Sequence, residues 1–316
     1  MDVVSDAISA VRIGRPSSNR VRVGGSWCTR LAPYDGAGFH IVLEGGCRLL
    51  GEDGTTLALN AGDAVLLPHG AGHVLADSEA DAARAEQAVP FERFAEGSIP
   101  WVRMPGPGEV ELLCGKYRLD RSRVHPLLAE LPEVVHLPNR VGRHPELRSA
   151  IDLLGRELSG HRPGSLIALP SLLDLLLVYM IRAWLAEGSA GAWSAVLDDA
   201  VAAEALRALH ADPAAPWTND RLAAEVGVSR ATLARRFTAL VGRPPTAYLT
   251  WWRLTLAAAR LRDTPDPLAA IARQVGYGTP YALSHAFLRE FGTTPGRYRA
   301  SCATGKVHRS GAQGSV

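Results

Sequence analysis

The sequence has few cysteines and lacks the spacings that would tie them to a structural metal or a disulfide framework. Its 316 residues contain four cysteines, and no two of them form a Cys-x-x-Cys pair. This absence excludes a zinc finger and a densely cross-linked secreted fold. The first residues also lack a basic segment followed by an uninterrupted apolar stretch, so no secretory signal is predicted and a cytoplasmic protein is expected.

Long uninterrupted apolar runs are missing as well. The longest apolar stretch, residues 166–185, is broken by Pro170, Asp174 and Arg182. Because each charged group near a bilayer centre costs about 2.5 kcal/mol or more, a buried or dimer-forming helix is favoured over a membrane span. The composition, 47% hydrophobic and 21% charged, is typical of a globular protein, and the length predicts two domains.

The net charge of +2 conceals two oppositely charged parts. Residues 1–209 hold 20 Lys and Arg against 26 Asp and Glu, whereas residues 210–300 hold 12 against 6. All basic residues in the second stretch are arginines, whose planar guanidinium can hold a phosphate or a guanine edge through two hydrogen bonds. An anionic partner is therefore expected for the C-terminal part.

The N-terminal half shows short apolar segments separated by glycine or proline. This pattern predicts antiparallel strands in a sandwich or barrel. The predicted strands are residues 21–23, 40–43, 47–50, 55–59, 64–67 and 112–119. From residue 144 onward, apolar residues recur every three or four positions, which predicts helices. The fold class expected is α+β multidomain, with an N-terminal antiparallel β-barrel plus helices and an all-α C-terminal domain.

The second predicted helix, residues 166–185, is apolar over more than one face and must bury both sides. One interpretation is that it packs on its own domain and on a second copy of the chain, which predicts a homodimer. The other interpretation is an internal core helix. The sequence GSAG at residues 188–191 is expected to be a short connector.

The strongest motif lies in residues 217–237. Thr218 or Asn219 can cap a first helix. Gly227 permits a tight turn, and Ser229 can cap a second helix. The pattern predicts a helix-turn-helix whose second helix enters a major groove about 12 Å wide.

The same pattern returns about fifty residues later, in residues 267–291. Ala272 and Gly276 repeat the three-residue gap of the first motif, and Thr279 stands at the position of its capping serine. A tandem pair of such motifs, bridged by a helix predicted at about 246–261, is much more specific than a single one.

The closing sequence VGYGTPYALSHAFLREFGTTPGRYR resembles the signature of the AraC/XylS family of bacterial transcription regulators. The matching residues are Gly276, Tyr277, Phe287, Phe291, Gly292, Pro295, Tyr298 and Arg299. Thr279, Leu283 and His285 stand where the family has Ser, Phe and Arg. Pro280 occupies the first turn of the second recognition helix, where proline is tolerated. Because unperturbed imidazole is mostly uncharged at neutral pH, His285 is expected to weaken the DNA contacts of that helix.

The resemblance implies that two recognition helices occupy successive major grooves on one face of a duplex. The implied base-facing residues are Ala231, Ala234 and Arg235 in the first helix and Tyr281, Ser284 and His285 in the second. The implied phosphate contacts are Arg230, Arg236 and Thr279, and the wider set of DNA-binding candidates adds Ser229 and Thr232. For each arginine the alternative is a solvated helix face.

Residues 62–73, GDAVLLPHGAGH, match the second cupin motif, which resembles the branch of the AraC family with a cupin-like sensor. His40 and Glu44 imitate part of the first cupin motif, but four residues of strand put their Cα atoms about 13 Å apart, too far to share one ion. His40 and His73 are expected to face each other across the barrel, with His69, as candidate holders of a metal or an anionic ligand. Hydrogen-bonded structural histidines are the alternative.

Cys28, Cys47 and Cys114 all fall in the predicted sensor domain. A thiol of low pKa near Lys116 would sense oxidants, and Cys28 and Cys114 are the sensing candidates. The alternative, favoured by the apolar character of free cysteine, is that the thiols fill the core.

These observations predict a transcription regulator whose expected partners are double-stranded DNA, a second copy of the chain, an unidentified small-molecule or redox effector, and RNA polymerase if it activates. The protein is not expected to be an enzyme, to require a cofactor or to enter a membrane. One alternative is a metal-dependent cupin enzyme tethered to a DNA-binding module, and another is a helical module that binds only a protein partner. The predicted parts are a cupin-like ligand-sensing domain (1–135), a helical dimerisation or linker region (136–197), an AraC-type DNA-binding domain (198–301) with helix-turn-helix motifs at about 218–239 and 267–291, and a disordered tail (302–316).

Overall fold

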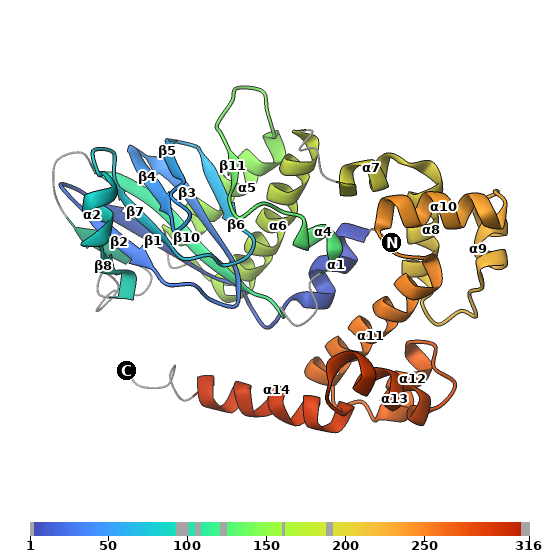
Figure 1. The fold of residues 1–316 in the computed structure, drawn as a ribbon. Coiled ribbons are helices and arrows are strands. Elements are labelled where there is room, and N and C mark those ends of the chain that lie inside the picture. Colours follow the sequence, from blue (N-terminus) through green and yellow to red (C-terminus); the bar gives the residue numbers. More distant parts are fainter. Residues whose placement is uncertain are drawn as a thin grey trace. The chain divides into compact units, whose positions relative to one another are not determined.

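The computed structural model describes residues 3–92, 101–104, 109–120, 125–159, 162–187 and 192–310. The chain divides into two compact units, of which one contains residues 11–189 and the other contains residues 1–10 together with 190–316 (Figure 1). The predicted connector at residues 188–191 lies outside the described residues.

The unit of residues 11–189 is built on two mostly antiparallel sheets, and every strand expected from the sequence is present. The six-stranded sheet has the order β11-β6-β3-β10-β1-β9, and the five-stranded sheet has the order β5-β4-β7-β2-β8 (Figure 1). The strands are β1 (Ser17–Val23), β2 (Cys28–Leu31), β3 (Gly36–Glu44), β4 (Gly46–Gly51), β5 (Thr56–Asn60), β6 (Ala64–Leu67), β7 (His73–Asp77), β8 (Val89–Pro90), β9 (Trp101–Met104), β10 (Val110–Arg118) and β11 (Val135–Leu137).

The sandwich alternative is confirmed, and the closed barrel is wrong. The chain changes sheets at Gly45, whose φ of 75° turns β3 of the first sheet into β4 of the second. A barrel closes only when its edge strands pair in register, and within the described residues no ladder joins the edges of one sheet to those of the other. The inner faces share one core, to which Val42 and Leu112 contribute from the first sheet and Leu49 and Leu75 from the second.

Two long helices cover the six-stranded sheet. The first, α5 (Pro145–Leu158), buries the apolar stripe that the sequence predicts. The second, α6 (Ser165–Ala186), is held to β10 by Tyr117, which donates its hydroxyl hydrogen to the Leu173 carbonyl oxygen at 2.6 Å. The short helices α2 (Ala82–Glu86) and α4 (Pro126–Ala129) lie in connections between strands.

The other unit is helical and includes the first helix of the chain. Its helices are α1 (Val3–Val11), α7 (Ala192–Asp198), α8 (Ala200–Ala211), α9 (Asn219–Glu225), α10 (Arg230–Val241), α11 (Pro245–Asp263), α12 (Leu268–Gln274), α13 (Pro280–Phe291) and α14 (Pro295–Ser310). The predicted domains placed residues 1–10 with the sensor, whereas the structure groups them with the C-terminal helices. The last helix continues to Ser310, beyond residue 302 at which the predicted tail begins, and residues 311–316 lie outside the described part.

A buried polar network ties α1 to this unit. The His210 side chain, on α8, donates from Nδ1 to the Asp6 carboxylate of α1 at 3.1 Å. Its Nε2 lies 2.8 Å from the Tyr248 hydroxyl of α11, and its ring stacks on Trp252 with 4.2 Å between centroids. The apolar side of α1, including Val4 and other valines, alanines and isoleucine, is buried as well. Packing of an apolar helix face together with this network explains why residues 1–10 belong to the helical unit.

Candidate nucleic-acid interface and sensor cavity

The first helix-turn-helix is fixed by local hydrogen bonds and a buried hairpin. Thr218 Oγ1 accepts the Arg221 backbone N–H at 3.1 Å, and Ser229 Oγ accepts the Thr232 N–H at 3.2 Å. Gly227 between the two helices has a φ of 70°, which favours glycine. Because each cap occupies an N–H that a helix leaves unpaired, both helices begin where the sequence predicts.

The other face of α10 carries the predicted DNA-binding residues. Leu233 and Phe237 are fully buried, while the side chains of Arg230, Arg235 and Arg236 are exposed. The remaining candidates divide into exposed Ser229 and Ala231 and half-buried Thr232 and Ala234. All candidates from the first motif are thus at least partly exposed, whereas the buried side of α10 carries Leu233 and Phe237.

Two of these arginines are engaged within the unit. Arg236 Nη2 lies 2.5 Å from Asp199 Oδ2, and the other oxygen of that carboxylate caps α8. Arg230 Nη1 lies 3.5 Å from Asp220 Oδ2, where both side chains are largely exposed. A phosphate contact by Arg236 thus requires exchange of one anionic partner for another.

The second helix-turn-helix repeats the same local design. Thr279 Oγ1 accepts the Ala282 N–H at 3.1 Å, and Pro280 fills the first position of α13, where its missing N–H costs nothing. Gly276 has a φ of 82°, and a Cβ there would come within 2.8 Å of the Ala214 Cα. On the outer face of α13, the predicted base-facing residues are exposed Tyr281 and His285 and half-buried Ser284.

Several arginines of the basic stretch are structural. Arg253 on α11 donates from Nε to the Pro213 carbonyl oxygen at 2.6 Å and from Nη2 to the Ala215 carbonyl oxygen at 2.8 Å. Arg262 is only 7% exposed and pairs with Asp263 at 2.7 Å. The charge count of the sequence therefore overstates the basic surface offered to an anionic partner.

The sandwich contains a cavity of about 230 Å³ in which two of the three predicted histidines, His40 and His73, meet. His40 on β3 and His73 on β7 face each other from different sheets, with 2.7 Å between their Nε2 atoms, as the sequence predicts. His40 Nδ1 lies 3.1 Å from Cys114 Sγ on β10. The structure does not bring His69 to this pair, because its Nε2 donates instead to the Leu131 carbonyl oxygen at 2.6 Å.

Burial keeps these groups uncharged. It lowers the pKa of His40 and of His73, and the charge of His73 lowers that of His40 further. It raises the pKa of the Cys114 thiol, that of Cys47 to about 12, and that of Cys28. Sensing by a thiol of depressed pKa is therefore not supported.

The histidine pair does not fit a shared metal ion as it is arranged. Two nitrogens bound to one tetrahedral zinc at about 2 Å each lie about 3.3 Å apart, whereas the two Nε2 atoms are at hydrogen-bonding distance. In the described part of the chain, no group of three or more His, Cys, Asp or Glu is arranged to hold a metal. Glu44 from the imitated motif is exposed and pairs with Arg22 at 3.8 Å.

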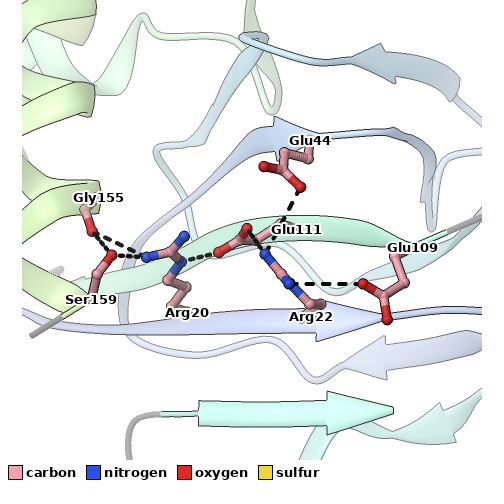
Figure 2. Close-up of polar contacts among 7 residues, drawn as sticks. All are labelled: Arg20, Arg22, Glu44, Glu109, Glu111, Gly155 and Ser159. Carbon is pink, nitrogen blue, oxygen red and sulfur yellow. Dashed lines mark hydrogen bonds and ion pairs between the residues drawn. The ribbon is translucent and has the colours of Figure 1, made fainter. Parts of the chain in front are cut away.

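A charged cluster that the sequence did not indicate anchors the cavity wall to α5 (Figure 2). Glu111 of β10 is 1% exposed and lies between Arg20 and Arg22 of β1, with Arg22 Nη2 at 2.7 Å. Arg20 also donates to the Gly155 carbonyl oxygen of α5 at 3.3 Å and contacts Ser159. One signal for this cluster is present in the sequence, the alternation of arginine with valine along β1. That alternation does not indicate Glu111 as the partner of the arginines.

Comparison with known proteins gives two family matches and several full-length relatives. The cupin family matches residues 2–186, and the helix-turn-helix domain family matches residues 222–301. A Streptomyces antibioticus protein described as an AraC-like transcription regulator is 35% identical over 95% of this chain and 98% of its own length. The chain belongs to the AraC family of transcription regulators.

The chain is also similar to a second full-length regulator and to a solved DNA-binding domain. A Streptomyces lividans AraC-like transcription regulator is 36% identical over 95% of this chain and 98% of that protein. The DNA-binding domain of AdpA, solved in complex with a target DNA, is 31% identical over 33% of this chain and 93% of that domain, with a TM-score of 0.31. The AraC-family chain is thus a DNA-binding transcription regulator with a cupin-like N-terminal domain, as its sequence predicted.

Proposed function

We propose that this regulator reads two successive major grooves with α10 and α13 under the control of an effector bound in its sandwich. The observation that carries the proposal is the repetition of one design. Each of the two helices is capped by a hydroxyl, from Ser229 or Thr279, and follows a glycine of positive φ. Each also buries a Leu and a Phe and turns polar side chains outward. Two such helices in tandem are suited to paired grooves.

Within α10, Arg235 is the proposed base-reading residue, since it is exposed and one helical turn from Ala231. The small Ala231 and Ala234 let the helix approach the base edges closely, and a methyl group suits contact with thymine. Arg230 and Arg236 are proposed to hold phosphates, which position the helix without specifying sequence.

Within α13, Tyr281 is 80% exposed and is proposed to meet base edges together with Ser284 and His285. Thr279 remains the proposed phosphate contact of this helix. Because α13 presents a phenol and an imidazole where α10 presents arginines, it contributes fewer ionic contacts.

The regulator is proposed to act as a homodimer through α6. Leu166, Ile167 and Leu175 on this helix are 83%, 76% and 39% exposed, although its other side packs on the sheet. The less buried side of α6 carries apolar residues at a spacing of three and four positions, namely Leu172, Leu175 and Tyr179. This spacing is typical of the contact face of paired helices. By length and composition α6 also passes as a membrane span, the single such helix in the described part of the chain. Asp174 within α6 forms an ion pair with Arg12. Because charged groups are costly inside a bilayer, this pair favours the dimer-forming helix over a membrane span.

The proposal also places the protein in the cytoplasm, with no catalytic activity, no required cofactor and, if it activates, contact with RNA polymerase. A metal-dependent enzyme is the rival function for the cavity. Metal analysis of the protein purified without chelators, together with a search for turnover lost in His73→Ala, distinguishes the two functions.

Selection of bound sequences from random duplex DNA by the full-length protein tests the proposed function. Two motifs spaced by about one helical turn are expected in the selected DNA. Affinity for the selected duplex is expected to fall steeply with added salt. Failure to enrich any sequence, with no salt-dependent binding, would support a module that binds protein only.

A further inference from the structure

The cavity of the sandwich is lined by a thiol, two imidazoles and a hydroxyl to which the proposed function assigns no individual role. Its walls include Tyr34, His40, His73, Phe91, Cys114 and Lys116. Cys114 and His40 are register partners on β10 and β3, and both side chains point between the sheets. His73 reaches the same space from β7 of the other sheet. The cavity therefore brings a nucleophile and a base together beside open volume.

The proton positions in this group follow from one backbone contact. His73 Nδ1 lies 3.0 Å from the Ala71 carbonyl oxygen, which can only accept, so Nδ1 carries the proton and Nε2 of the neutral ring is bare. His40 must then donate its Nε2 hydrogen to His73, which leaves His40 Nδ1 bare. Cys114 consequently donates its S–H to His40 Nδ1, and the base already faces the thiol hydrogen.

This is the arrangement of an activated nucleophile: a thiol in contact with a base, and a third group that fixes the base. We propose that Cys114 is a covalent sensor site that captures small α,β-unsaturated carbonyl compounds entering the cavity. The chemistry of capture stands on the cavity alone, whereas its role in regulation rests on the proposed function.

The step balances without a further reactant. The Cys114 sulfur forms a bond to the β-carbon of the enone while the carbon–carbon π bond breaks and its electrons move toward the carbonyl oxygen. His40 Nδ1 takes the thiol proton and returns it to the α-carbon of the resulting enolate. The product is a thioether that contains every atom of thiol and enone, and the resting thiol is neutral, so thiolate forms only during attack.

Tyr34 supplies a hydrogen-bond donor in the cavity for the carbonyl group. Its hydroxyl is buried with no hydrogen-bond partner among the described residues, and a Cβ at Gly38 would come within 2.5 Å of it. Gly38 lies two residues from His40 on the same face of β3, a separation of about 6.6 Å. Gly38 also pairs with Lys116, two residues from Cys114 on β10, so the Tyr34 hydroxyl lies along the same cavity wall as the thiol. A hydroxyl placed there stabilises the developing enolate.

An enone is favoured over a small oxidant because the cavity is largely apolar and far larger than a peroxide requires. Leu31, Pro33 and Phe91 line it together with the glycines of β3 and β10. These walls accept a compact carbon skeleton, and the Tyr34 hydroxyl is a polar group of the lining that can meet the reacting carbonyl.

The test uses the folded full-length protein, 2-cyclohexen-1-one as the probe, and peptide mass spectrometry to measure the modification rate at each cysteine. Cys28, which is partly exposed and outside the cavity, serves as the internal reference. We expect an adduct of one enone at Cys114 that forms faster than the adduct at Cys28. His40→Gln should slow the reaction at Cys114 by about 100-fold and leave Cys28 unchanged.

Tyr34→Phe is the second variant, because it removes one oxygen and preserves the ring. It should slow enone addition at Cys114 by at least about tenfold while leaving alkylation by iodoacetamide unaffected, since that reaction develops no enolate. An unmodified Cys114 in protein whose Cys28 reacts overturns the proposal, as does an equal rate in folded His40→Gln. Loss of two mass units without an adduct would instead indicate a disulfide. DNA binding by the unmodified protein is measured separately, so failure of capture and failure of the proposed function are distinguishable.

Discussion

Replacement of Glu111 by glutamine should destabilise the sandwich more than any neighbouring charge change. The Glu111 side chain is 1% exposed and accepts hydrogen bonds from Arg20 and Arg22, whose side chains are 15% and 28% exposed (Figure 2). Removing one partner of a buried ion pair costs about 3 to 5 kcal/mol, and the partial exposure of the arginines favours the lower end. For a unit of this size a loss of about 3 kcal/mol lowers Tm by about 6 to 12 °C.

Differential scanning calorimetry of the full-length protein measures this shift in the transition that belongs to the sandwich. Glu109→Gln is the matched control, because Glu109 is 37% exposed and lies 3.8 Å from Arg22. Exposed pairs contribute about 1 kcal/mol or less, so the control should shift Tm by no more than about 4 °C. Equal shifts in the two variants would refute the argument that burial makes Glu111 important.

The Tm difference between wild type and Glu111→Gln should depend on pH. Burial alone would raise the pKa of Glu111, but the hydrogen bonds and charges of Arg20 and Arg22 outweigh it and leave the pKa below its usual value. A carboxyl whose pKa is lower in the folded state stabilises the protein above its unfolded pKa of about 4.3 and loses that contribution as the pH falls through the folded value. The Tm difference between wild type and Glu111→Gln should therefore be full at pH 7 and shrink below about pH 4.

Three further predictions concern the interface, the dimer and the helical unit. Arg235→Ala should lose about 1 to 3 kcal/mol of discrimination at one base pair, measured by competition with single-position operator variants, and equal loss on random DNA would reassign Arg235 to a phosphate. Leu175→Asp should convert a dimer to a monomer in sedimentation velocity, whereas Leu153→Asp, a control on exposed α5 surface, should not. Tyr248→Phe should cost the helical unit about 1 to 3 kcal/mol by removing the hydroxyl beside His210, and an unchanged Tm would show that this hydrogen bond contributes nothing.

Helices α10 and α13 were predictable because the residues that determine them are local in the sequence. The Ser229 hydroxyl accepts an N–H only three residues onward, and Gly227 adopts the positive φ of the turn by itself. Each of these signals therefore lies within a few residues of the structure that it specifies. The strands were predictable for the same reason, since alternation and turn residues are read over a few positions. The facing of His40 and His73 followed from the cupin resemblance.

Contacts between distant residues were not predictable from these patterns. Arg20 meets Glu111 across 91 positions, and Asp6 meets His210 across 204, so neither partner is indicated by its own neighbourhood. An open sandwich differs from a closed barrel in whether the edge strands pair. Short alternating segments are typical of both folds, so the sequence pattern does not distinguish them. Arg253 carries the same charge as Arg235, and only the carbonyl groups near its guanidinium reveal that it is structural.

Helices α10 and α13 carry different side chains on their outer faces, which leads to a last prediction. The outer face of α13 presents Tyr281, His285 and Leu288, none of which is a permanent cation. If α13 lies in a groove, His285→Arg adds one permanent cation at the DNA surface and should steepen the slope of log affinity against log salt by about 0.9. Fluorescence anisotropy on the selected duplex at a series of salt concentrations measures that slope, with Arg207→Lys on α8 as a charge-preserving control. A slope identical to that of the wild type would mean that α13 does not approach the duplex, and α10 alone would then account for binding.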